Sequence, residues 1–348
     1  MIRVLLADDS TLVRAILKDV LGSAGDMTVV GEAVNGVEAV ALNEALRPDI
    51  IIMDILMPVM GGLEATETIM AKRPAPILIL SATLDDRDVK LAFTAIKKGA
   101  LDVMGKPALA ADVNQGEFVA RLLEKIRLLA RIKVIHHIQR RREPDAVAVQ
   151  KLPANRSILA IGASTGGPKA VLSILKTLPA GFNGAVFVVQ HISSGFAHGF
   201  AHWLDIECQL PVRLAEAGDQ PLRGEVLVAP TDCQMRLENG VIRVLDAPAV
   251  NCCRPSIDVF FSSLAADRGR DTVGVLLTGM GRDGAQGLAE IRNSGGFTIV
   301  QDEKSCVVFG MPKAAIALNA AEAVLSLEAI PDAVNKIFNS QRGDIHVE

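Results

Sequence analysis

The chain has 348 residues, half of them hydrophobic, and this length allows two globular domains of ordinary size, each with its own core. Tyr is absent, there is one Trp, and aromatic residues make up 3%, which argues against a base-stacking surface for single-stranded nucleic acid. The formal net charge of -4 argues against a polyanion-binding surface, so nucleic acid is not an expected partner.

The N-terminus and the cysteines indicate the cellular compartment of the protein. Its first residues are too few and too acidic for a signal peptide, and no apolar run reaches transmembrane length. The five cysteines all lie in the second half and form no CxxC pair, so disulfides and a zinc site are not expected. Free thiols suit a reducing compartment, and the sequence therefore predicts a cytoplasmic protein without a transmembrane segment.

Strand and helix patterns alternate over the first ~125 residues. Short apolar runs predict strands at 3–7, 27–33, 50–54, 77–81 and 102–104. Helices are expected between them at 12–22, 37–46, 62–70 and 86–97, with a last helix that begins near Asn114. Five βα units with short connections predict an α/β domain over residues 1–125, an open doubly wound parallel sheet of the flavodoxin-like kind.

Polar side chains stand at the ends of four of these strands. Asp8 and Asp9 follow the first, Asp54 closes the third, Ser81 closes the fourth, and Lys106 follows the fifth. These ends converge at one edge of a parallel sheet, where three carboxylates repel one another unless a divalent cation such as Mg²⁺ joins them. A carboxylate beside Mg²⁺ can attack a phosphoryl group while a lysine and a hydroxyl bind its oxygens. Each residue alone is an ordinary strand-end side chain, but together they indicate a phosphorylation site.

On these residues, the first part of the chain resembles the receiver domain of two-component response regulators. The resemblance implies that Asp54 is the phosphoryl acceptor. It also implies that Asp8 and Asp9 bind Mg²⁺ together with Asp54 and the backbone carbonyl of Leu56.

The resemblance further implies Ser81 as the switch hydroxyl and Lys106 as the lysine that this family carries at that position. Two positions depart from the usual pattern. Val103 stands where many receivers have an aromatic switch residue, so an aromatic rotamer switch is not expected. Gly61 stands where an Asp often precedes a glycine in this family, and neither departure bears on phosphorylation.

A linker is expected between the two halves. The last helix of the first half is predicted to continue through Ile135 and then to become basic at Arg140–Arg142. This basic run is more typical of a solvated helix end than of a nucleic-acid-binding patch. The following segment has no period and contains Pro144 and Pro153. The sequence predicts a helical extension and linker over 126–155 and a second domain over 156–348.

Alternating strands and helices in the second half predict another doubly wound parallel sheet, Rossmann-like and in three layers. Ser164, His191 and Asp283 each follow a strongly apolar run, and Ser164 lies in the glycine-rich segment GASTGGP. Parallel strands would bring these side chains to one edge of the sheet. An activated serine needs a base, which His191 can supply, and a carboxylate such as Asp283 can fix the tautomer of that base.

Other details of this constellation sharpen the hypothesis. The chain order Ser–His–Asp differs from that of the α/β-hydrolases, and the serine is not in a GxSxG motif, so this would be an independent solution of the same geometry. Glycines around Met280 leave its backbone N–H accessible as an oxyanion donor. A lone serine after a strand is more typical of a helix N-cap, and the later histidine and aspartate favour catalysis instead.

Two motifs in this half allow other interpretations. The run GASTGGPK looks like a phosphate-binding loop, but Pro168 occupies the position that requires lysine. Residues 279–284 form GxGxxG after a strand, with Asp302 at the next strand end, as in a dinucleotide fingerprint. That fingerprint normally opens its domain, and Met280 and Arg282 crowd the turn, so an NAD-linked oxidoreductase is the weaker alternative.

Over about residues 156–345, the chain resembles the catalytic domain of the chemotaxis protein-glutamate methylesterases, the CheB family. The matching runs are IGASTGGP, VVQHI, VAP, RPSIDVFF and LLTGMGRDGA. The resemblance implies Ser164, His191 and Asp283 as a catalytic triad, with Thr165 assisting His191 and Met280 at the oxyanion site.

A receiver followed by this domain implies phosphorylation-regulated hydrolysis of glutamate methyl esters on chemoreceptors, with deamidation of receptor glutamines as a related activity. The implied partners are methylated chemoreceptors, as substrate, and a chemotaxis histidine kinase, as phosphodonor. Mg²⁺ is expected for receiver phosphorylation, and no cofactor is expected for ester hydrolysis. Cys253 stands where the family often has a histidine, so substrate preference or loop detail is expected to differ.

Two alternatives from other classes remain open at this point. A DNA-binding response regulator needs a basic helix-turn-helix output domain, whereas residues 156–348 carry more acidic than basic residues. A phosphorylation-gated docking module with an inactive site would share the receiver but release no methanol from methylated receptors.

Overall fold

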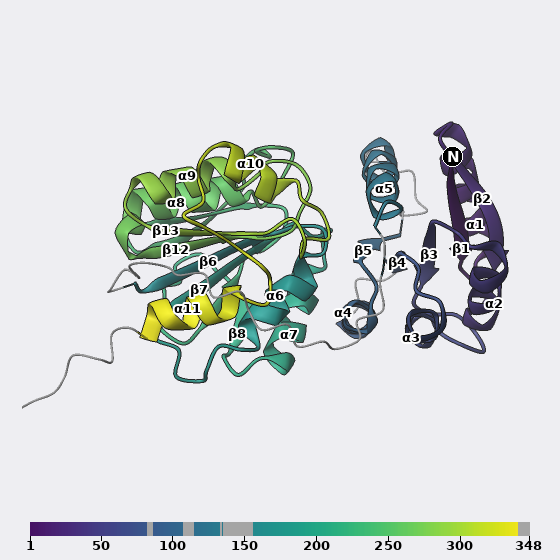
Figure 1. Cartoon of the computed structure of the whole chain (residues 1–348), viewed down its shortest axis with the longest axis horizontal. Coiled ribbons are helices and arrows are strands. Elements are labelled where there is room, and N and C mark those ends of the chain that lie inside the picture. Colours follow the sequence, from purple (N-terminus) through teal and green to yellow (C-terminus); the bar gives the residue numbers. More distant parts are fainter. Residues whose placement is uncertain (82–85, 107–114, 133, 135–155, 340–348) are drawn as a thin grey trace, which may run out of the picture. The chain divides into compact units, whose positions relative to one another are not determined.

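The computed structural model describes residues 1–81, 86–106, 115–132, 134 and 156–339. The chain divides into two compact units, Met1–Arg141 and Arg142–Glu348 (Figure 1). The predicted domain limits at 125 and 156 stay predictions, because most of the intervening segment lies outside the described residues. Among the described residues, none of the helices combines the length and the apolar character that crossing a membrane requires.

The first unit is built on a five-stranded parallel sheet in the order β2-β1-β3-β4-β5. This is the order of flavodoxin-like folds and confirms the predicted fold class. Its elements are β1 (Ile2–Ala7), α1 (Thr11–Ser23), β2 (Met27–Ala33), α2 (Gly36–Leu46), β3 (Ile50–Asp54), α3 (Gly62–Lys72), β4 (Ile77–Ser81), α4 (Asp86–Lys98), β5 (Asp102–Gly105) and α5 (Gln115–Leu129).

Helices cover both faces of this sheet. The helices α1 and α5 pack on one face around Leu17 and Ile126, and α2, α3 and α4 contact one another in series. All residues of β3 and β4 are buried, as their continuous apolar runs predict. At the start of α3 the chain passes so close to β3 that a Cβ on Gly62 would lie 1.9 Å from the backbone oxygen of Asp54. Only glycine fits there, directly beside the predicted phosphoryl acceptor.

The last helix of the first unit is shorter than expected. It ends at Leu129, whereas the sequence predicted that it would continue through Ile135. Arg131 and Ile132 N–H groups donate to the carbonyls three residues earlier, so the chain leaves the α-helical pattern in a tightened turn. The predicted helix start near Asn114 and the basic run at 140–142 lie outside the described residues.

The second unit contains a seven-stranded parallel sheet in the order β14-β13-β12-β6-β7-β9-β8. In Figure 1, α8, α9 and α10 cover one face and α6, α7 and α11 cover the other, which confirms the three-layer prediction. The elements are β6 (Ile158–Ala163), α6 (Gly167–Leu175), β7 (Ala185–Gln190), α7 (Ala197–Glu207), β8 (Val212–Leu214), β9 (Val226–Val228), β10 (Gln234–Glu238), β11 (Val241–Leu245), α8 (Ile257–Arg268), a 3₁₀ turn (Gly269–Asp271), β12 (Thr272–Leu276), α9 (Ala285–Asn293), β13 (Phe297–Gln301), α10 (Met311–Ala317), β14 (Ala323–Leu325) and α11 (Ile330–Asn339).

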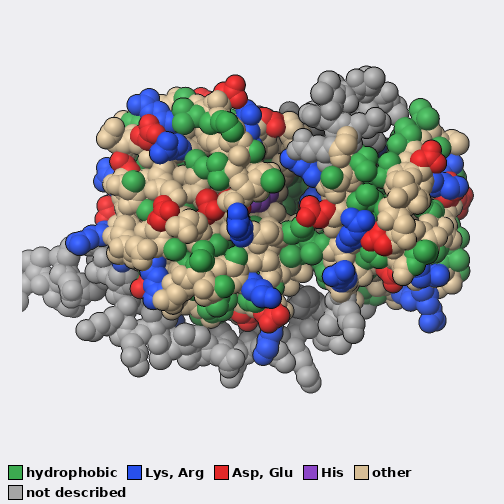
Figure 2. All heavy atoms as spheres, turned by 90° about the horizontal axis from the view of Figure 1, so that it is seen from above, with side chains coloured by type: hydrophobic (Ala, Val, Ile, Leu, Met, Phe, Trp, Pro, Cys, Tyr) green, Lys and Arg blue, Asp and Glu red, His purple; other side chains and the backbone are tan. Residues whose placement is uncertain are grey.

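The strand order places the predicted catalytic residues together. The strands β12, β6 and β7 are adjacent at the centre of the sheet, and the chain leaves β6 toward β7 on one side before returning to β12 on the other. Ligands of such sheets bind where the strand order switches direction. The antiparallel hairpin β10–β11 lies outside the main sheet and packs on α8, where Leu237 N–H donates to Ser263 Oγ. On the face drawn in Figure 2, positive and negative side chains are interspersed over both units.

Candidate active site

The carboxyl ends of β1, β3 and β5 form an acidic pocket with one lysine in the first unit. Lys106 Nζ lies 2.7 Å from Asp8 Oδ2 and 2.9 Å from Asp54 Oδ2, and all three side chains are less than a tenth exposed. Backbone N–H groups of Ser10 and Ile55 donate to the other oxygens of Asp8 and Asp54. The predicted convergence of these strand ends is therefore present.

Burial shapes the protonation of this pocket. It raises the pKa of the Asp54 carboxyl to about 6, against the opposing effect of Lys106, and the neighbouring Asp8 charge raises it further. Burial by itself would lower the pKa of the Lys106 ammonium, but its bonds to Asp8 and Asp54 leave this pKa above its ordinary value. Lys106 therefore stays charged between Asp8 and Asp54, and ionising Asp54 costs free energy because its carboxyl is buried.

The same pocket offers a set of hard oxygen ligands. Carboxylate oxygens of Asp8, Asp9 and Asp54 lie within 4.8 Å of one another. Asp9 is exposed, whereas the other two are buried. Oxygen donors of this kind and number fit Mg²⁺. The carbonyl of Leu56, which the family resemblance adds to this set, stays a prediction.

The predicted switch hydroxyl lies on β4, and the residue at the usual aromatic switch position lies on β5. Ser81 is buried at the end of β4, and its backbone carbonyl accepts from Lys106 N–H at 2.7 Å. Val103 is buried in β5 opposite Ile79. The residues that follow Ser81 lie outside the described part of the chain, so its switch role stays a prediction.

In the second unit, the strand register places the predicted nucleophile beside the predicted base. The strands β6 and β7 pair in parallel up to Ala163 and Gln190, and His191 N–H then donates to Ala163 O at 2.9 Å. On the other side, Ser164 N–H donates to Thr278 O at 3.0 Å beyond the end of β12. Ser164 therefore stands between the ends of its two neighbouring strands. No hydrogen bond joins Ser164 Oγ to His191 among the described residues, and such bonds often tighten only when substrate binds.

Gln190 links the backbones of these two residues. Its Nε2 donates to Ser164 O at 2.8 Å and to His191 O at 2.9 Å. Gln190 is 3% exposed, and its buried Oε1 has no hydrogen-bond partner among the residues that the structure describes. The oxygen also lies 2.2 Å from where a Cβ on Gly167 would stand, so α6 can begin this close only with glycine. No motif in the sequence marks this glutamine as part of the site.

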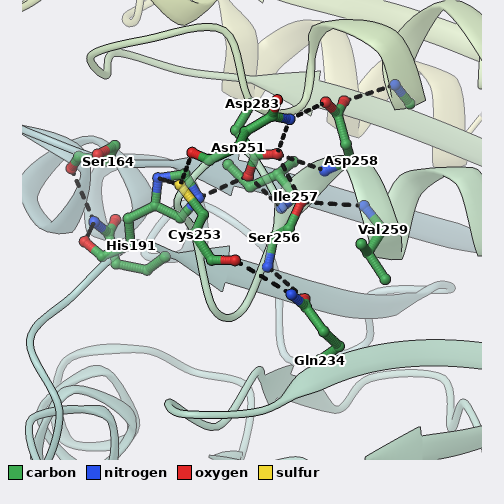
Figure 3. Close-up of polar contacts among 12 residues, drawn as sticks. Ser164, His191, Gln234, Asn251, Cys253, Ser256, Ile257, Asp258, Val259 and Asp283 are labelled. Carbon is green, nitrogen blue, oxygen red and sulfur yellow. Dashed lines mark hydrogen bonds and ion pairs between the residues drawn. The ribbon is translucent and has the colours of Figure 1, made fainter. Parts of the chain in front are cut away.

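His191 and Asp283 form the central polar contact of the site (Figure 3). His191 Nε2 lies 2.8 Å from Asp283 Oδ2, and Asp283 is 2% exposed. The carboxylate also sits at the N-terminus of α8, where Ile257 N–H donates to Oδ2 at 2.6 Å and Ser256 Oγ donates to Oδ1 at 2.6 Å. Unpaired N–H groups and the helix dipole favour a negative charge at this position. The RPSIDVFF run thus supplies the groups that hold the carboxylate.

These contacts determine the tautomer of the histidine. Burial by itself would raise the pKa of the Asp283 carboxyl, but hydrogen bonds from His191, Asn251 and Ser256 hold the pKa below its ordinary value. The carboxylate can therefore only accept, and the proton of a neutral His191 must lie on Nε2. The Nδ1 atom is left as the basic nitrogen of the ring.

A tight turn at 250–253 brings two further side chains to this pair. Val250 and Cys253 exchange backbone hydrogen bonds, and Asn251 and Cys252 between them have φ of 52° and 60°. Asn251 Nδ2 donates to Asp258 Oδ2 at 2.7 Å and to Asp283 Oδ1 at 3.0 Å. Cys253 Sγ lies 3.7 Å from His191 Nδ1. From the sequence, Cys253 is a departure from the family pattern, and its contact with His191 is visible only in the fold.

The two remaining predicted residues lie beside the triad. Met280 N–H has no hydrogen-bond partner among the described residues, whereas the preceding Gly279 N–H donates to Val308 O. A free N–H in this loop is what an oxyanion donor requires. Thr165 is buried, and its carbonyl accepts from Thr278 Oγ1. In the described chain, no hydrogen bond connects the Thr165 side chain to His191, so its assisting role stays a prediction.

Comparisons with known proteins agree with this picture over the whole chain. Residues 159–334 match the protein family described as CheB methylesterase, and residues 4–115 match the family described as response regulator receiver domain. A protein-glutamate methylesterase/protein-glutamine glutaminase 2 of Anaeromyxobacter dehalogenans is 43% identical over 97% of both chains. A protein-glutamate methylesterase/protein-glutamine glutaminase 3 of Pseudomonas aeruginosa is 44% identical over 97% of this chain and 100% of its own.

A solved structure supports the fold of the second unit. The crystal structure of the CheB methylesterase catalytic domain of Thermotoga maritima is 36% identical to this chain, with a TM-score of 0.51. The match covers 52% of this chain and 98% of that domain. The similarity thus extends over a complete catalytic domain of that kind.

Proposed function

Because the chain belongs to the CheB methylesterase family and also carries a response regulator receiver domain, we propose that it hydrolyses glutamate methyl esters on chemoreceptors under the control of phosphorylation. The observation that carries the proposal is the hydrogen bond between His191 and the buried Asp283 carboxylate, beside Ser164, where the chain leaves three adjacent strands. The full-length similarity to proteins named methylesterase and glutaminase supports the same reaction.

The proposed reaction begins with attack by the Ser164 hydroxyl on the ester carbonyl. His191 takes the hydroxyl proton on Nδ1, because Nε2 is occupied by its hydrogen bond to Asp283. The oxyanion that develops is stabilised by the backbone N–H of Met280, which has no hydrogen-bond partner within the described part of the chain. The tetrahedral intermediate then expels methanol, which receives the proton from His191. Ser164 is left esterified to the receptor glutamate.

Water completes the cycle. His191 accepts a proton from a water molecule, which attacks the acyl-enzyme and releases the glutamate carboxylate while the proton returns to Ser164. Asp283 stays ionised throughout and stabilises the imidazolium that forms twice per turnover. A glutamine side chain in the same position would release ammonia instead of methanol. Deamidation therefore needs no further groups, and the ester reaction needs no cofactor.

We propose Asp54 as the phosphoryl acceptor of the receiver, with a chemotaxis histidine kinase as donor. Asp8, Asp9 and Asp54 would hold Mg²⁺, which neutralises charge on the phosphoryl group when bound. Lys106 and Ser81 would bind phosphoryl oxygens, and the ion pair of Lys106 with Asp54 and the pairing of β4 with β5 support this assignment. None of the five cysteines, all of them among the described residues, is in a disulfide, which supports a reducing, cytoplasmic location.

Methanol release from methylated chemoreceptor tests the proposed activity. The purified full-length chain is incubated with receptor carrying labelled methyl esters, with and without a small phosphodonor and Mg²⁺. The expected result is methanol release that rises on phosphorylation in the wild type, does not respond in Asp54→Asn, and is lost in Ser164→Ala. Absence of release from a folded wild-type chain under all conditions would favour the docking module with an inactive site.

A further inference from the structure

The sulfur of Cys253 and the basic nitrogen of His191 face each other at the candidate active site (Figure 3). Cys253 Sγ lies 3.7 Å from His191 Nδ1. Donor atoms of Cys253, His191 and Asp283 all lie within 4.8 Å of one another. The His191 side chain is 15% exposed, and Cys253 is half-buried, so solvent reaches the place where the two meet.

The pair has the chemistry of a thiophilic metal site. Asp283 accepts the proton of His191 Nε2, so Nδ1, 3.7 Å from the sulfur, keeps a lone pair that can bind a cation. A carboxylate that receives the second N–H of an imidazole is the usual partner of a metal-ligating histidine. Thiolate and imidazole together select Zn²⁺ and related cations over the harder Mg²⁺.

The spacing also fits. A tetrahedral Zn²⁺ with Zn–N near about 2.1 Å and Zn–S near about 2.3 Å separates its two ligand atoms by about 3.6 Å. The observed separation is 3.7 Å, so binding requires little movement of either side chain.

The turn that carries Cys253 is held in place by the fold. Backbone hydrogen bonds of 3.1 and 2.9 Å close the turn between Val250 and Cys253. Buried Gln234 donates from Nε2 to Cys253 O and to Pro248 O, and accepts from Ser256 N–H through Oε1. The cysteine is therefore presented to His191 before any ligand arrives, which lowers the ordering cost of binding.

We propose that Cys253 and His191 bind Zn²⁺ or a similar thiophilic divalent cation, and that the bound cation reversibly inhibits the esterase. Binding replaces the proton of the Cys253 thiol, which leaves to solvent, and involves no change of oxidation state. The remaining positions of the cation are filled by water. Because the cation takes the lone pair of Nδ1, His191 can no longer accept the proton of Ser164.

The inhibitory part of this inference rests on the proposed function, whereas the binding part does not. The experiment therefore measures both separately in the full-length chain. Co²⁺ serves as the probe for binding, because a thiolate ligand gives it a charge-transfer absorption. Zn²⁺, added in the presence of excess Mg²⁺, serves as the probe for inhibition of methanol release.

In excess Mg²⁺, which occupies the receiver carboxylates, wild-type protein is expected to bind one Co²⁺ that gives the thiolate band, and Zn²⁺ is expected to displace it. At ten times the dissociation constant of Zn²⁺, methanol release should fall about tenfold, and a chelator should restore it. Cys253→Ser and Cys253→Ala should lose the band, and the ratio of their activities with and without Zn²⁺ should approach one. The exposed neighbour provides the matched control, since Cys252→Ser should keep both the band and the inhibition.

Two outcomes would overturn the proposal. One is a folded wild-type chain without the thiolate band. The other is a Cys253→Ser variant that Zn²⁺ inhibits as strongly as the wild type. A thiolate band that depends on Cys253, in a chain that releases no methanol even without metal, would keep the site and reject the proposed function instead.

Discussion

Gln190 Nε2 donates to the backbone carbonyl of Ser164 at 2.8 Å, so a buried glutamine on β7 holds the end of β6, where the predicted nucleophile begins its turn. The same amide holds the carbonyl of His191 at 2.9 Å. The distance between nucleophile and base is thus set through their backbones as well as by their side chains.

Replacing Gln190 by Met, which has a similar shape, should misplace the Ser164–His191 pair. Two buried carbonyls lose their donor, at a cost of about 1–3 kcal/mol in unfolding free energy. A small displacement of reacting groups costs about 10²-fold in rate, so kcat should fall by about that factor while KM changes little. Kinetics of methanol release and thermal unfolding measure the two effects. Gln286→Met, on the exposed surface of α9, is the matched control and should change neither.

Ser164→Ala should abolish ester hydrolysis and leave the fold intact. The hydroxyl makes no hydrogen bond among the described residues, so its loss removes little packing or bonding. Without the nucleophile, only the catalysis due to binding and the oxyanion site remains, a loss of about 10⁶-fold in kcat by comparison with a known triad. Methanol release and circular dichroism check both parts, with Ser173→Ala on α6 as a control. Wild-type rates in the Ser164 variant would remove this residue from the mechanism.

Asp283→Asn should reduce kcat by roughly 10⁴-fold, because an amide no longer stabilises the imidazolium or fixes the Nε2–H tautomer. It should also destabilise the fold near neutral pH, because an NH₂ group would face N–H donors at the start of α8.

The pH dependence of the unfolding free energy follows from the direction in which folding shifts the pKa of Asp283. Folding lowers the pKa of the Asp283 carboxyl below its ordinary value of 3.8. The ionised carboxylate therefore adds to the free energy of unfolding above pH 3.8, and this stabilisation is lost as the pH falls through the pKa of the folded chain. The stability difference between wild type and Asp283→Asn should therefore narrow as the pH falls below 4. Unfolding titrations at several pH values measure this, and a rate loss under about tenfold would make Asp283 a structural residue only.

Asp54→Asn should stabilise the receiver at neutral pH when divalent cations are removed. The pKa of the Asp54 carboxyl rises from 3.8 to about 6 on folding. The contribution of Asp54 to the free energy of unfolding is therefore fully present below pH 3.8, where the carboxyl is protonated, and is lost as the pH rises through about 6. Two pKa units correspond to at most about 3 kcal/mol. The variant lacks this titration, and its advantage over the wild type should grow between pH 5 and pH 7.5.

Thermal unfolding in a chelator measures this difference, and Mg²⁺ should reduce it by binding more tightly to the wild-type carboxylates. Asp19→Asn, on the exposed face of α1, serves as a control for a general change of charge. A stability difference that does not vary with pH would show that Asp54 is not the group that titrates.

Local pattern alone determined the two parallel sheets and the catalytic candidates. Continuous apolar runs such as 50–54 and 158–163 mark buried strands, and the residue that ends each run must lie at the carboxyl edge of its sheet. Asp54, Ser164 and His191 could be found in this way because their positions depend only on where a strand stops. The short edge strands β8 and β14 were not predicted, because neither is a continuous buried apolar run.

Only the tertiary structure decided what surrounds those candidates. Gln190 closes a fully buried strand and looks like any strand-end polar residue until its amide meets the carbonyl of Ser164 beyond β6 as well as that of the adjacent His191. Cys253 lies 62 residues from His191 in the chain, so no spacing rule connects the two. Their contact depends on a turn in which Asn251 and Cys252 adopt positive φ, and on the helix N-terminus that holds Asp283. Such contacts arise from how whole elements pack, because side chains distant in sequence meet only after the sheet and its helices have assembled.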